Sequence, residues 1–258
     1  MATDQELLTS RIIFRAVLPV IKVMLEDDPK MGAKFEGLTA TIQFKAQDPA
    51  GPTGGHLKFE DGAFSVVPEL IENPELEFRF SSVAKMNDMF TGKTVLPSIK
   101  GITKIGLLIK ALSLLLGLKI LMPDAKPKTP EQARLKVKMT LYMVSTALSQ
   151  LNKAGDPDMA EWTAKQPERI YQWSVDDTDI ACYLKVKAGR TKAGRGPYTR
   201  RQPFVHMRFR SIEDALPVLS NEVDTVQAMT QGMVVNDGSP EYGSRLGDFM
   251  LRIAAMLN

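Results

Sequence analysis

The sequence predicts an α+β fold that occurs twice along the chain, as two tandem domains in which helices cover a largely antiparallel sheet. Residues 73–86 (NPELEFRFSSVAKM) and 202–215 (QPFVHMRFRSIEDA) share a proline, an arginine, a phenylalanine and a serine at an offset of 129 in a 258-residue chain. Upstream, DPKM at 28–31 returns as DPDM at 156–159. Two matches in the same order and at similar offsets indicate an internal repeat of one structural unit. Strand runs bracketed by helices favour the α+β class.

Each half opens with a helical pattern. ELLTSRIIFRAVLPVIKVMLED at 6–27 and EQARLKVKMTLYMVSTALSQL at 131–151 place their apolar residues largely on one side. Pro19 is expected to kink the first helix, because proline removes a backbone hydrogen bond. The DPxM sequence that follows each helix is interpreted as a turn.

Alternating or β-branched runs follow the opening helices and predict the strands. They are LTATIQFK, GGHLKFEDGAFSV and LEFRFSS in the first half, and RIYQWSV, IACYLKVKAG and FVHMRFRS in the second. Asp61-Gly62 and Ala188-Gly189 lie at matching places and predict hairpin turns. The sheet is therefore expected to be largely antiparallel.

Helical spacing returns at 81–93 and 211–223, and each half closes with an apolar helix, at 102–122 and at 243–257. A short strand is expected at SIKG, before the first of these closing helices. The proline-rich stretch PDAKPKTPEQ lacks apolar periodicity. The predicted domains are residues 1–123 and 131–258, with a linker at 124–130.

The closing segment 102–122 is the most apolar part of the chain, yet Lys104, Lys110 and Lys119 interrupt it. A transmembrane helix needs about 20 largely uncharged apolar residues, so a membrane span is disfavoured. Its apolar residues cover more than the stripe that one-sided packing needs. We therefore expect apolar matter on two sides: the other half of the chain, a second copy, a membrane surface or a ligand.

Composition and charge set further limits. Hydrophobic residues make up 44% and charged residues 24%, which is typical of a globular protein. The single Cys182 lies in a strand-like setting, which excludes a disulfide scaffold. The N-terminus lacks the pattern of a secretory signal, so a cytoplasmic location is expected. Lys185 to Arg201 contains seven basic residues and no acidic one, and is interpreted as a basic loop.

The sequence lacks the motifs of common catalytic and cofactor sites. His56 and His206 are the only histidines and neither has an obvious partner, so no triad and no histidine-based metal site is expected. The glycine-rich stretches at 51–55 and 189–196 match neither a phosphate loop nor a dinucleotide motif. We expect no catalytic residues, no metal and no cofactor.

These pieces together resemble the sterol carrier protein type 2 family of lipid-binding domains. The likeness rests on the opening helix, the NPELEFRFS strand leading into an amphipathic helix, the TGK turn at 91–93, the SIKG strand and the apolar final helix. It covers nearly the whole first half. The second half is more divergent: Gln202 replaces the asparagine, the TGK turn is missing, and VVNDGSPEYG inserts a polar loop before the final helix.

The resemblance implies a five-stranded sheet in each domain and an apolar tunnel between sheet and helices. Residues expected to line the tunnels and bind lipid are Met86, Met89, Phe90, Leu108, Leu112 and Leu115 in the first half, and Met229, Met233, Leu246, Phe249, Met250 and Ile253 in the second. Ordinary core packing is the alternative for each of them.

The leading functional hypothesis is non-enzymatic binding and carriage of an apolar ligand, either a fatty acid, an acyl thioester or a sterol-like lipid. The alternative is a scaffold or accessory protein for a partner enzyme or a membrane surface, in which the basic loop binds an anionic head group. The candidate anion-binding residues are Arg190, Lys192, Arg195, Arg200 and Arg201. Nucleic acid ranks lower because the loop offers one aromatic residue, Tyr198. A homodimer is a further possibility.

Overall fold

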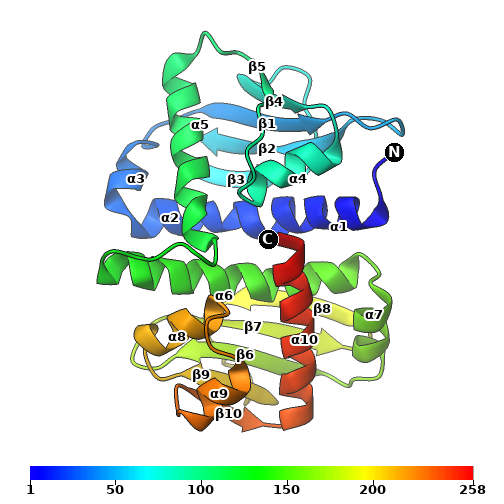
Figure 1. Cartoon of the computed structure of the whole chain (residues 1–258), viewed down its shortest axis with the longest axis vertical. Helices are drawn as coiled ribbons and strands as arrows, with labels where there is room; N and C mark the ends of the chain where they lie inside the picture. Colours follow the sequence, from blue (N-terminus) through cyan, green and yellow to red (C-terminus); the bar gives the residue numbers. More distant parts are fainter. Residues whose placement is uncertain (258) are drawn as a thin grey trace. The chain divides into compact units, whose positions relative to one another are not determined.

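A computed structural model of the chain describes residues 1–257, which form two compact units (Figure 1). Unit 1 comprises Met1–Lys119 and unit 2 comprises Ile120–Met256. Each unit contains one five-stranded sheet together with covering helices. The α+β class predicted from the sequence is confirmed.

Unit 1 begins with a long, interrupted helix and ends with the apolar helix α5. Its elements in chain order are α1 (Asp4–Ile12), η1 (Ile13–Val17), η2 (Leu18–Val20), α2 (Ile21–Asp27), α3 (Pro29–Ala33), β1 (Ala40–Ala46), β2 (Thr53–Glu60), β3 (Ala63–Val67), β4 (Leu76–Phe80), α4 (Val83–Phe90), β5 (Ser98–Lys100) and α5 (Ile105–Leu118). A 3-10 turn, η3 (Lys119–Leu121), follows.

Unit 2 repeats this plan with a longer opening helix and one extra short helix. Its elements are α6 (Pro130–Lys153), α7 (Pro157–Ala164), β6 (Arg169–Val175), β7 (Ala181–Lys187), β8 (Arg190–Arg195), β9 (Val205–Phe209), α8 (Ile212–Leu219), α9 (Thr225–Thr230), β10 (Val234–Gly238) and α10 (Pro240–Leu257). The sequence pattern did not predict α9. The linker that precedes α6 is tethered by Lys136, whose Nζ donates to the carbonyls of Met122 (3.0 Å) and Ala125 (2.6 Å).

The two sheets have the same strand order. Unit 1 reads β3-β2-β1-β4-β5, and unit 2 reads β8-β7-β6-β9-β10. Three pairings in each sheet are antiparallel, but β1 with β4 and β6 with β9 are parallel. The sheets are therefore mixed. Hairpin turns in the sequence predicted antiparallel pairing. No local sequence signal indicates that β4 pairs parallel with β1, or that β9 pairs parallel with β6.

The internal repeat corresponds to equivalent structural positions. Ser82 and Ser211 begin α4 and α8, and each side chain accepts a hydrogen bond from the amide three residues later, at 3.2 Å and 3.1 Å. The predicted hairpin turns are also present: Asp61 and Ala188 have φ values of 48° and 44°, and a glycine with positive φ follows each one. Such paired positive φ angles are typical of two-residue hairpins.

The DPxM sequences begin helices and are not isolated turns, which corrects the sequence interpretation. Asp28 accepts hydrogen bonds from two amides at the start of α3, and Asp156 accepts one from Met159 at the start of α7. The proline that follows each aspartate occupies the first helical turn, where its missing N–H costs nothing. The aspartate is the cap that starts each helix.

The opening helix of unit 1 changes its winding around Pro19, where the sequence predicted a kink. The five residues of η1 form a π-helical turn and the three residues of η2 form a 3-10 turn, before α2 resumes as α-helix. Proline cannot donate to the preceding turn, so the hydrogen-bond pattern shifts on both sides of it.

Two predicted loops in unit 2 are strands instead. VVNDG at 234–238 forms β10, which pairs antiparallel with β9 at the edge of the sheet. The basic segment contains the end of β7 and the whole of β8, which also lies at an edge. Polar and charged residues mark loops in sequence patterns, but edge strands carry them as well, because one side of an edge strand faces solvent.

Each sheet buries one apolar face under its helices. In unit 1, Ile42, Phe44, Leu57 and Phe78 lie on this inner face and are at most 1% exposed. In Figure 1, α4 and α5 cross in front of this sheet, and α8, α9 and α10 lie in front of the sheet of unit 2. The backbones of α4 and α6 approach their sheets more closely than those of the closing helices α5 and α10 do. Side chains fill the wider layers.

Candidate functional site

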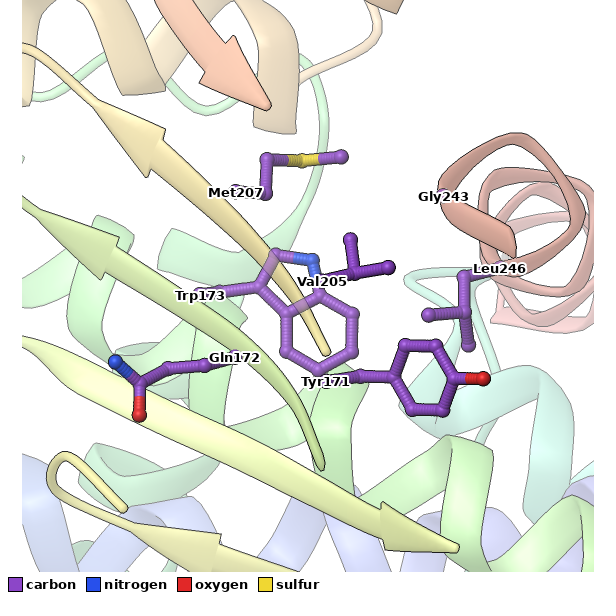
Figure 2. A pocket seen from close by; sticks show the side chains of 7 residues that line it. All are labelled: Tyr171, Gln172, Trp173, Val205, Met207, Gly243 and Leu246. Carbon is purple, nitrogen blue, oxygen red and sulfur yellow. The ribbon is translucent and has the colours of Figure 1, made fainter. Parts of the chain in front are cut away.

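A small cavity lies between the sheet of unit 2 and its closing helix α10 (Figure 2). Its lining is largely apolar, with Tyr171, Trp173, Val205 and Met207 from the sheet and Leu246 from α10. The parallel register places Tyr171 beside Val205 and Trp173 beside Met207, so alternate residues of β6 and β9 form one wall. The free volume is about 10 Å³, roughly what one water molecule requires.

Gly243 and Gln172 complete the lining of the cavity. Gly243 is buried, and a Cβ atom added to it would lie 2.9 Å from Nδ2 of Asn236, so a larger residue would crowd this wall. The side chain of Gln172 points away from α10 (Figure 2), as the alternation along β6 requires. The cavity is therefore an apolar space under the closing helix.

Arg169 lies on the same face of β6 as Tyr171 and Trp173. It is two residues before Tyr171, which lines the cavity. Its guanidinium carbon is 4.0 Å from the ring centre of Phe204 and 4.3 Å from that of Tyr242. Its Nη1 atom is buried and has no acceptor among the described residues. The guanidinium also interacts with the hydroxyls of Tyr242 and Tyr171. A guanidinium that packs against two rings and keeps one buried N–H group without an acceptor is suited to an anionic group.

An aromatic cluster joins Arg169 to the cavity. The Tyr171 ring packs against those of Trp162 (5.4 Å) and Phe204 (6.1 Å), and Trp162 also contacts Phe249 on α10 at 5.6 Å. The Tyr171 hydroxyl donates to Oε1 of Gln166. Burial raises the pKa of Tyr171 well above its usual value, so the hydroxyl remains a neutral donor.

Sequence reasoning missed Arg169, Trp162 and Tyr242. A signal was present in RIYQWSV, where alternate positions place an arginine, a tyrosine and a tryptophan on one face of the strand. Arg169 is the first residue on a face of β6 that is otherwise apolar, which indicates that the buried part of this face ends there.

The lipid-binding residues predicted in unit 2 lie in different environments. Leu246, Phe249 and Ile253 are buried on the inner side of α10, and Met250 is half-buried. Only Leu246 among them lines the cavity. Met233 is half-buried just before β10, while Met229 is exposed on α9. Neither Met229 nor Met233 lines the cavity.

The lipid-binding residues predicted in unit 1 lie on α4 and α5. Met86 and Phe90 are buried on the inner side of α4, where the ring of Phe90 meets that of Phe44 edge-on at 5.1 Å. Met89, Leu108 and Leu115 are half-buried. Leu112 is 44% exposed and lies on the outer side of α5.

The predicted anion-binding residues do not converge on one point. Arg190 and Lys192 lie on the outer face of β8, whereas Arg195 lies on the inner face, with its guanidinium 5.1 Å from the ring centre of Tyr142. Arg200 and Arg201 follow the strand. Side chains of a strand point alternately to its two faces, so β8 places these basic residues on opposite sides of the sheet, whereas a loop could have brought them together.

Glu168 neutralises part of this basic surface. Its carboxylate lies 3.1 Å from Nζ of Lys185, 3.3 Å from Nζ of Lys187 and 2.8 Å from Nη2 of Arg201. The hydrogen bond from Lys185 is the largest influence that lowers the pKa of Glu168. Arg190, Lys192 and Arg200 have no carboxylate within ion-pair distance among residues 1–257. Three cations are thus available to a ligand.

The described part of the chain contains neither a cluster of metal ligands nor a membrane-spanning helix. No group of three or more histidine, cysteine, aspartate or glutamate side chains is arranged to hold a metal ion. None of the described helices has both the length and the apolar character needed to cross a bilayer.

Comparison with known proteins gives no family assignment. No family model matches the sequence, and no curated protein matches it. Among solved structures, the chain aligns with a stereoselective inverting sec-alkylsulfatase from Pseudomonas sp. at 14% identity and a TM-score of 0.26, and with a double mutant of a sec-alkyl sulfatase at 14% identity and 0.28. The alignments cover 58% and 57% of this chain and 28% of each sulfatase chain. Scores this low carry no argument about function.

Proposed function

We propose that this chain is a non-enzymatic lipid-binding protein of the sterol carrier type, which holds an apolar ligand between a closing helix and its sheet. The ligand classes are a fatty acid, an acyl thioester or a sterol-like lipid. The observation that carries the proposal is the apolar cavity under α10, with the free donor of Arg169 beside it. An apolar space with one convergent polar group is the usual form of a small-molecule site.

The two ends of this site suit the two ends of an acyl ligand. Arg169 offers a guanidinium, which binds carboxylates through paired hydrogen bonds. Leu246 and Met207 offer apolar surface, where each buried CH₂ group of a chain contributes about 0.8 kcal/mol. A fatty acid would therefore bind with its carboxylate at Arg169 and its tail under α10.

Entry of such a ligand requires α10 to move, since the free volume is about 10 Å³. Arg252 ties the C-terminal part of α10 to the start of α7, with Nη2 2.5 Å from Asp156 and Nη1 3.0 Å from Asp158. The N-terminal part contains Gly243 and Gly247, and among the described residues no ion pair joins it to another element; it is held instead by Tyr242, whose ring packs against Phe204 (5.2 Å) and Arg169 (4.3 Å). We propose that this part lifts away from the sheet while the C-terminal part stays in place.

Unit 1 is proposed to hold a ligand in the equivalent layer, between α4, α5 and the sheet. The half-buried side chains of Met89, Leu108 and Leu115 support this assignment, because side chains at the edge of a core can change rotamer without opening a cavity. Methionine adapts to irregular shapes through its unbranched side chain.

The test is to identify what the protein binds and to block the cavity. The chain is purified without denaturation, then denatured, and the released small molecules are identified by mass spectrometry; binding of a fluorescent fatty acid is measured in parallel. Leu246→Trp fills the cavity and should abolish binding in unit 2. Leu251→Trp is the matched control, because Leu251 lies on the same helix and is 59% exposed.

Arg169→Gln tests the polar end of the site. It should weaken binding of a fatty acid by about tenfold or more, while binding of the corresponding fatty alcohol stays unchanged. If no lipid co-purifies and none can be loaded, lipid carriage is refuted and a scaffold function becomes the better account.

A second candidate function is the binding of a phosphate-bearing group on the outer face of the unit 2 sheet. Lys185 lies directly opposite Lys192, and Lys187 directly opposite Arg190, across the β7–β8 pair. Like charges in directly opposite positions destabilise a sheet. Their presence with a single counter-ion, Glu168, favours an anionic ligand such as the phosphates of an acyl thioester or an acidic membrane surface.

A further inference from the structure

Helix α5 of unit 1 has an apolar side that faces solvent. Ile105, Ile109, Leu112 and Leu116 are 65%, 61%, 44% and 62% exposed. Their spacing of four, three and four residues places them on one side of the helix. The buried residues of the helix, Ala111, Leu114 and Leu118, lie on the opposite side. We call the four exposed residues the α5 stripe.

The α5 stripe differs from ordinary surface leucines because it is continuous. Four large apolar side chains within twelve positions cover about 16 Å of helix. Ile102, just before the helix, is 57% exposed and extends the same apolar surface along the chain. Contiguous exposed apolar surface marks an interaction site more often than scattered residues do.

The charged residues of the segment that contains the α5 stripe have one sign. Between Asp88 and Asp124 the sequence contains Lys93, Lys100, Lys104, Lys110 and Lys119 and no acidic residue. Lys110 lies 5.3 Å from the ring centre of Phe35, while Lys104 and Lys119 flank the helix and are exposed. Glu75 lies near Lys104, and its carboxylate already accepts hydrogen bonds from the hydroxyl and the amide of Thr41.

We propose that the α5 stripe docks the protein onto the surface of a lipid bilayer that contains anionic lipids. Apolar side chains with flanking lysines are the pattern of helices that lie in the membrane interface. The apolar residues would enter the acyl boundary, and Lys104 and Lys119 would meet anionic head groups. With 14 residues and one side packed in unit 1, α5 lies on the bilayer and does not cross it.

A second copy of the chain is a poorer occupant for the α5 stripe. Pairing two α5 helices would bring the lysines of both copies to one interface, with no acidic residue of this segment to balance them. Like charges brought together without partners oppose association. An anionic lipid surface instead supplies the opposite charge.

This inference goes beyond the proposed ligand site and does not depend on it. The ligand site was argued from the cavity of unit 2, whereas the membrane surface is argued from exposed residues of unit 1. Vesicle binding and ligand binding are measured separately, so each proposal can fail while the other holds.

The test is co-sedimentation of the full chain with vesicles. Vesicles of phosphatidylcholine mixed with phosphatidylglycerol should bind the protein, and vesicles of phosphatidylcholine alone should bind it much less. Ile109→Glu places a charge in the middle of the α5 stripe and should lower binding to the mixed vesicles by about tenfold or more. Val226→Glu is the control, because Val226 is 74% exposed on α9 and should leave binding unchanged.

Two further variants test the electrostatic part and guard against misfolding. Lys104→Gln with Lys119→Gln should weaken binding to the mixed vesicles and reduce its dependence on salt. Ile109→Ser is a milder stripe variant, and its circular dichroism should match that of the unchanged protein. Equal vesicle binding by Ile109→Glu and the unchanged chain would overturn the proposal. So would a dimer in analytical ultracentrifugation that Ile109→Glu dissociates, because a second copy would then cover the stripe.

Discussion

Gln43 and Gln172 make the same hydrogen bond at the same place in the two units. Each lies on the outer face of its central strand, and they are 129 residues apart, the offset of the sequence repeat (172 − 43). Oε1 of Gln43 accepts a hydrogen bond from the backbone amide of Ile71, and Oε1 of Gln172 accepts one from the backbone amide of Tyr198, both at 2.7 Å. In each unit the glutamine fastens a connecting segment across the outer face.

Replacement of Gln43 by methionine should destabilise unit 1. Gln43 is fully buried, and its Nε2 also donates to Glu77 (2.5 Å) and to the carbonyl of Ile71 (3.2 Å). Leaving these groups without partners should cost about 1–3 kcal/mol of unfolding free energy. Urea denaturation followed by circular dichroism measures the loss. Gln47→Met, at an exposed position after the same strand, should change little, and an equal loss in both variants would contradict the prediction.

Acid should weaken unit 2 through His206. Nε2 of His206 lies 3.2 Å from Nε2 of Gln172, which can only donate, so the bond requires an unprotonated ring nitrogen. Burial, and then Arg208, lower the pKa of His206, while Asp237 and Asp176 act in the opposite direction.

The sign of this pH dependence follows from proton binding. Below about pH 6.5 the unfolded chain takes up a proton at this histidine and the folded chain resists it. Stability is therefore fully present above about pH 6.5 and is lost as the pH falls toward the lower folded pKa. Thermal unfolding at a series of pH values should reveal the decline, and His206→Gln should flatten it in this window. An unchanged slope in that variant would refute the role of His206.

Removal of the Glu168 carboxylate should strengthen anion binding by unit 2. Glu168→Gln frees Lys185, Lys187 and Arg201 from their shared counter-ion. Affinity for inorganic tripolyphosphate should rise by roughly fivefold and fall as salt is added. Isothermal titration calorimetry measures both effects. Lys192→Gln should act in the opposite direction, and if neither variant alters binding, the outer face of this sheet is not an anion site.

Truncation of Leu246 should enlarge the cavity under α10. Leu246→Ala removes a side chain that is 2% exposed, and such changes cost about 2–5 kcal/mol of stability. An enlarged apolar cavity takes up small apolar molecules, so added benzene should raise the melting temperature of the variant more than that of the unchanged chain. A variant that loses stability without responding to benzene would indicate that the cavity has collapsed.

Cys182 should report on the unfolding of unit 2. It is fully buried, burial raises its pKa to about 12, and its Sγ donates to the carbonyl of Leu141 at 3.4 Å. Reaction with a thiol reagent requires the thiolate, so the native chain should react only at the rate at which unit 2 opens. Stopped-flow labelling with and without urea measures this rate. Fast labelling in native buffer would show that β7 opens locally.

Much of the fold followed from the sequence because its signals are local. Hairpin turns need positive φ at fixed positions, and Asp61-Gly62 and Ala188-Gly189 supply them. The serine that ends LEFRFSS caps the next helix through a bond to an amide three residues on. Helix patterns and caps depend on neighbours within one turn, and single-sequence reasoning reads those directly.

The remaining features depend on contacts that are distant in sequence. Nothing in β4 alone indicates that it returns parallel to β1, since that pairing joins Ile42 to Leu76. The buried setting of Arg169 depends on Phe204 and Tyr242, both more than thirty residues away. For the same reason Leu112 was assigned to a tunnel, although the side of α5 that packs inward is the one with Ala111 and Leu114. Which side of an all-round apolar helix is buried is decided by its partners.

The parallel pairing of β1 with β4 also sets the order in which each unit can fold. The β2–β3 hairpin closes over two turn residues and can form early, whereas β4 reaches β1 only after the chain from 47 to 75 has been brought round. Closing that longer loop carries the greater entropy cost, so it should limit the folding rate. The hydrogen bond from Ile71 to Gln43 lies within that loop and would form with this late step. In each unit the two antiparallel parts of the sheet are thus expected to form first, and the parallel pairing that joins them is expected to form last.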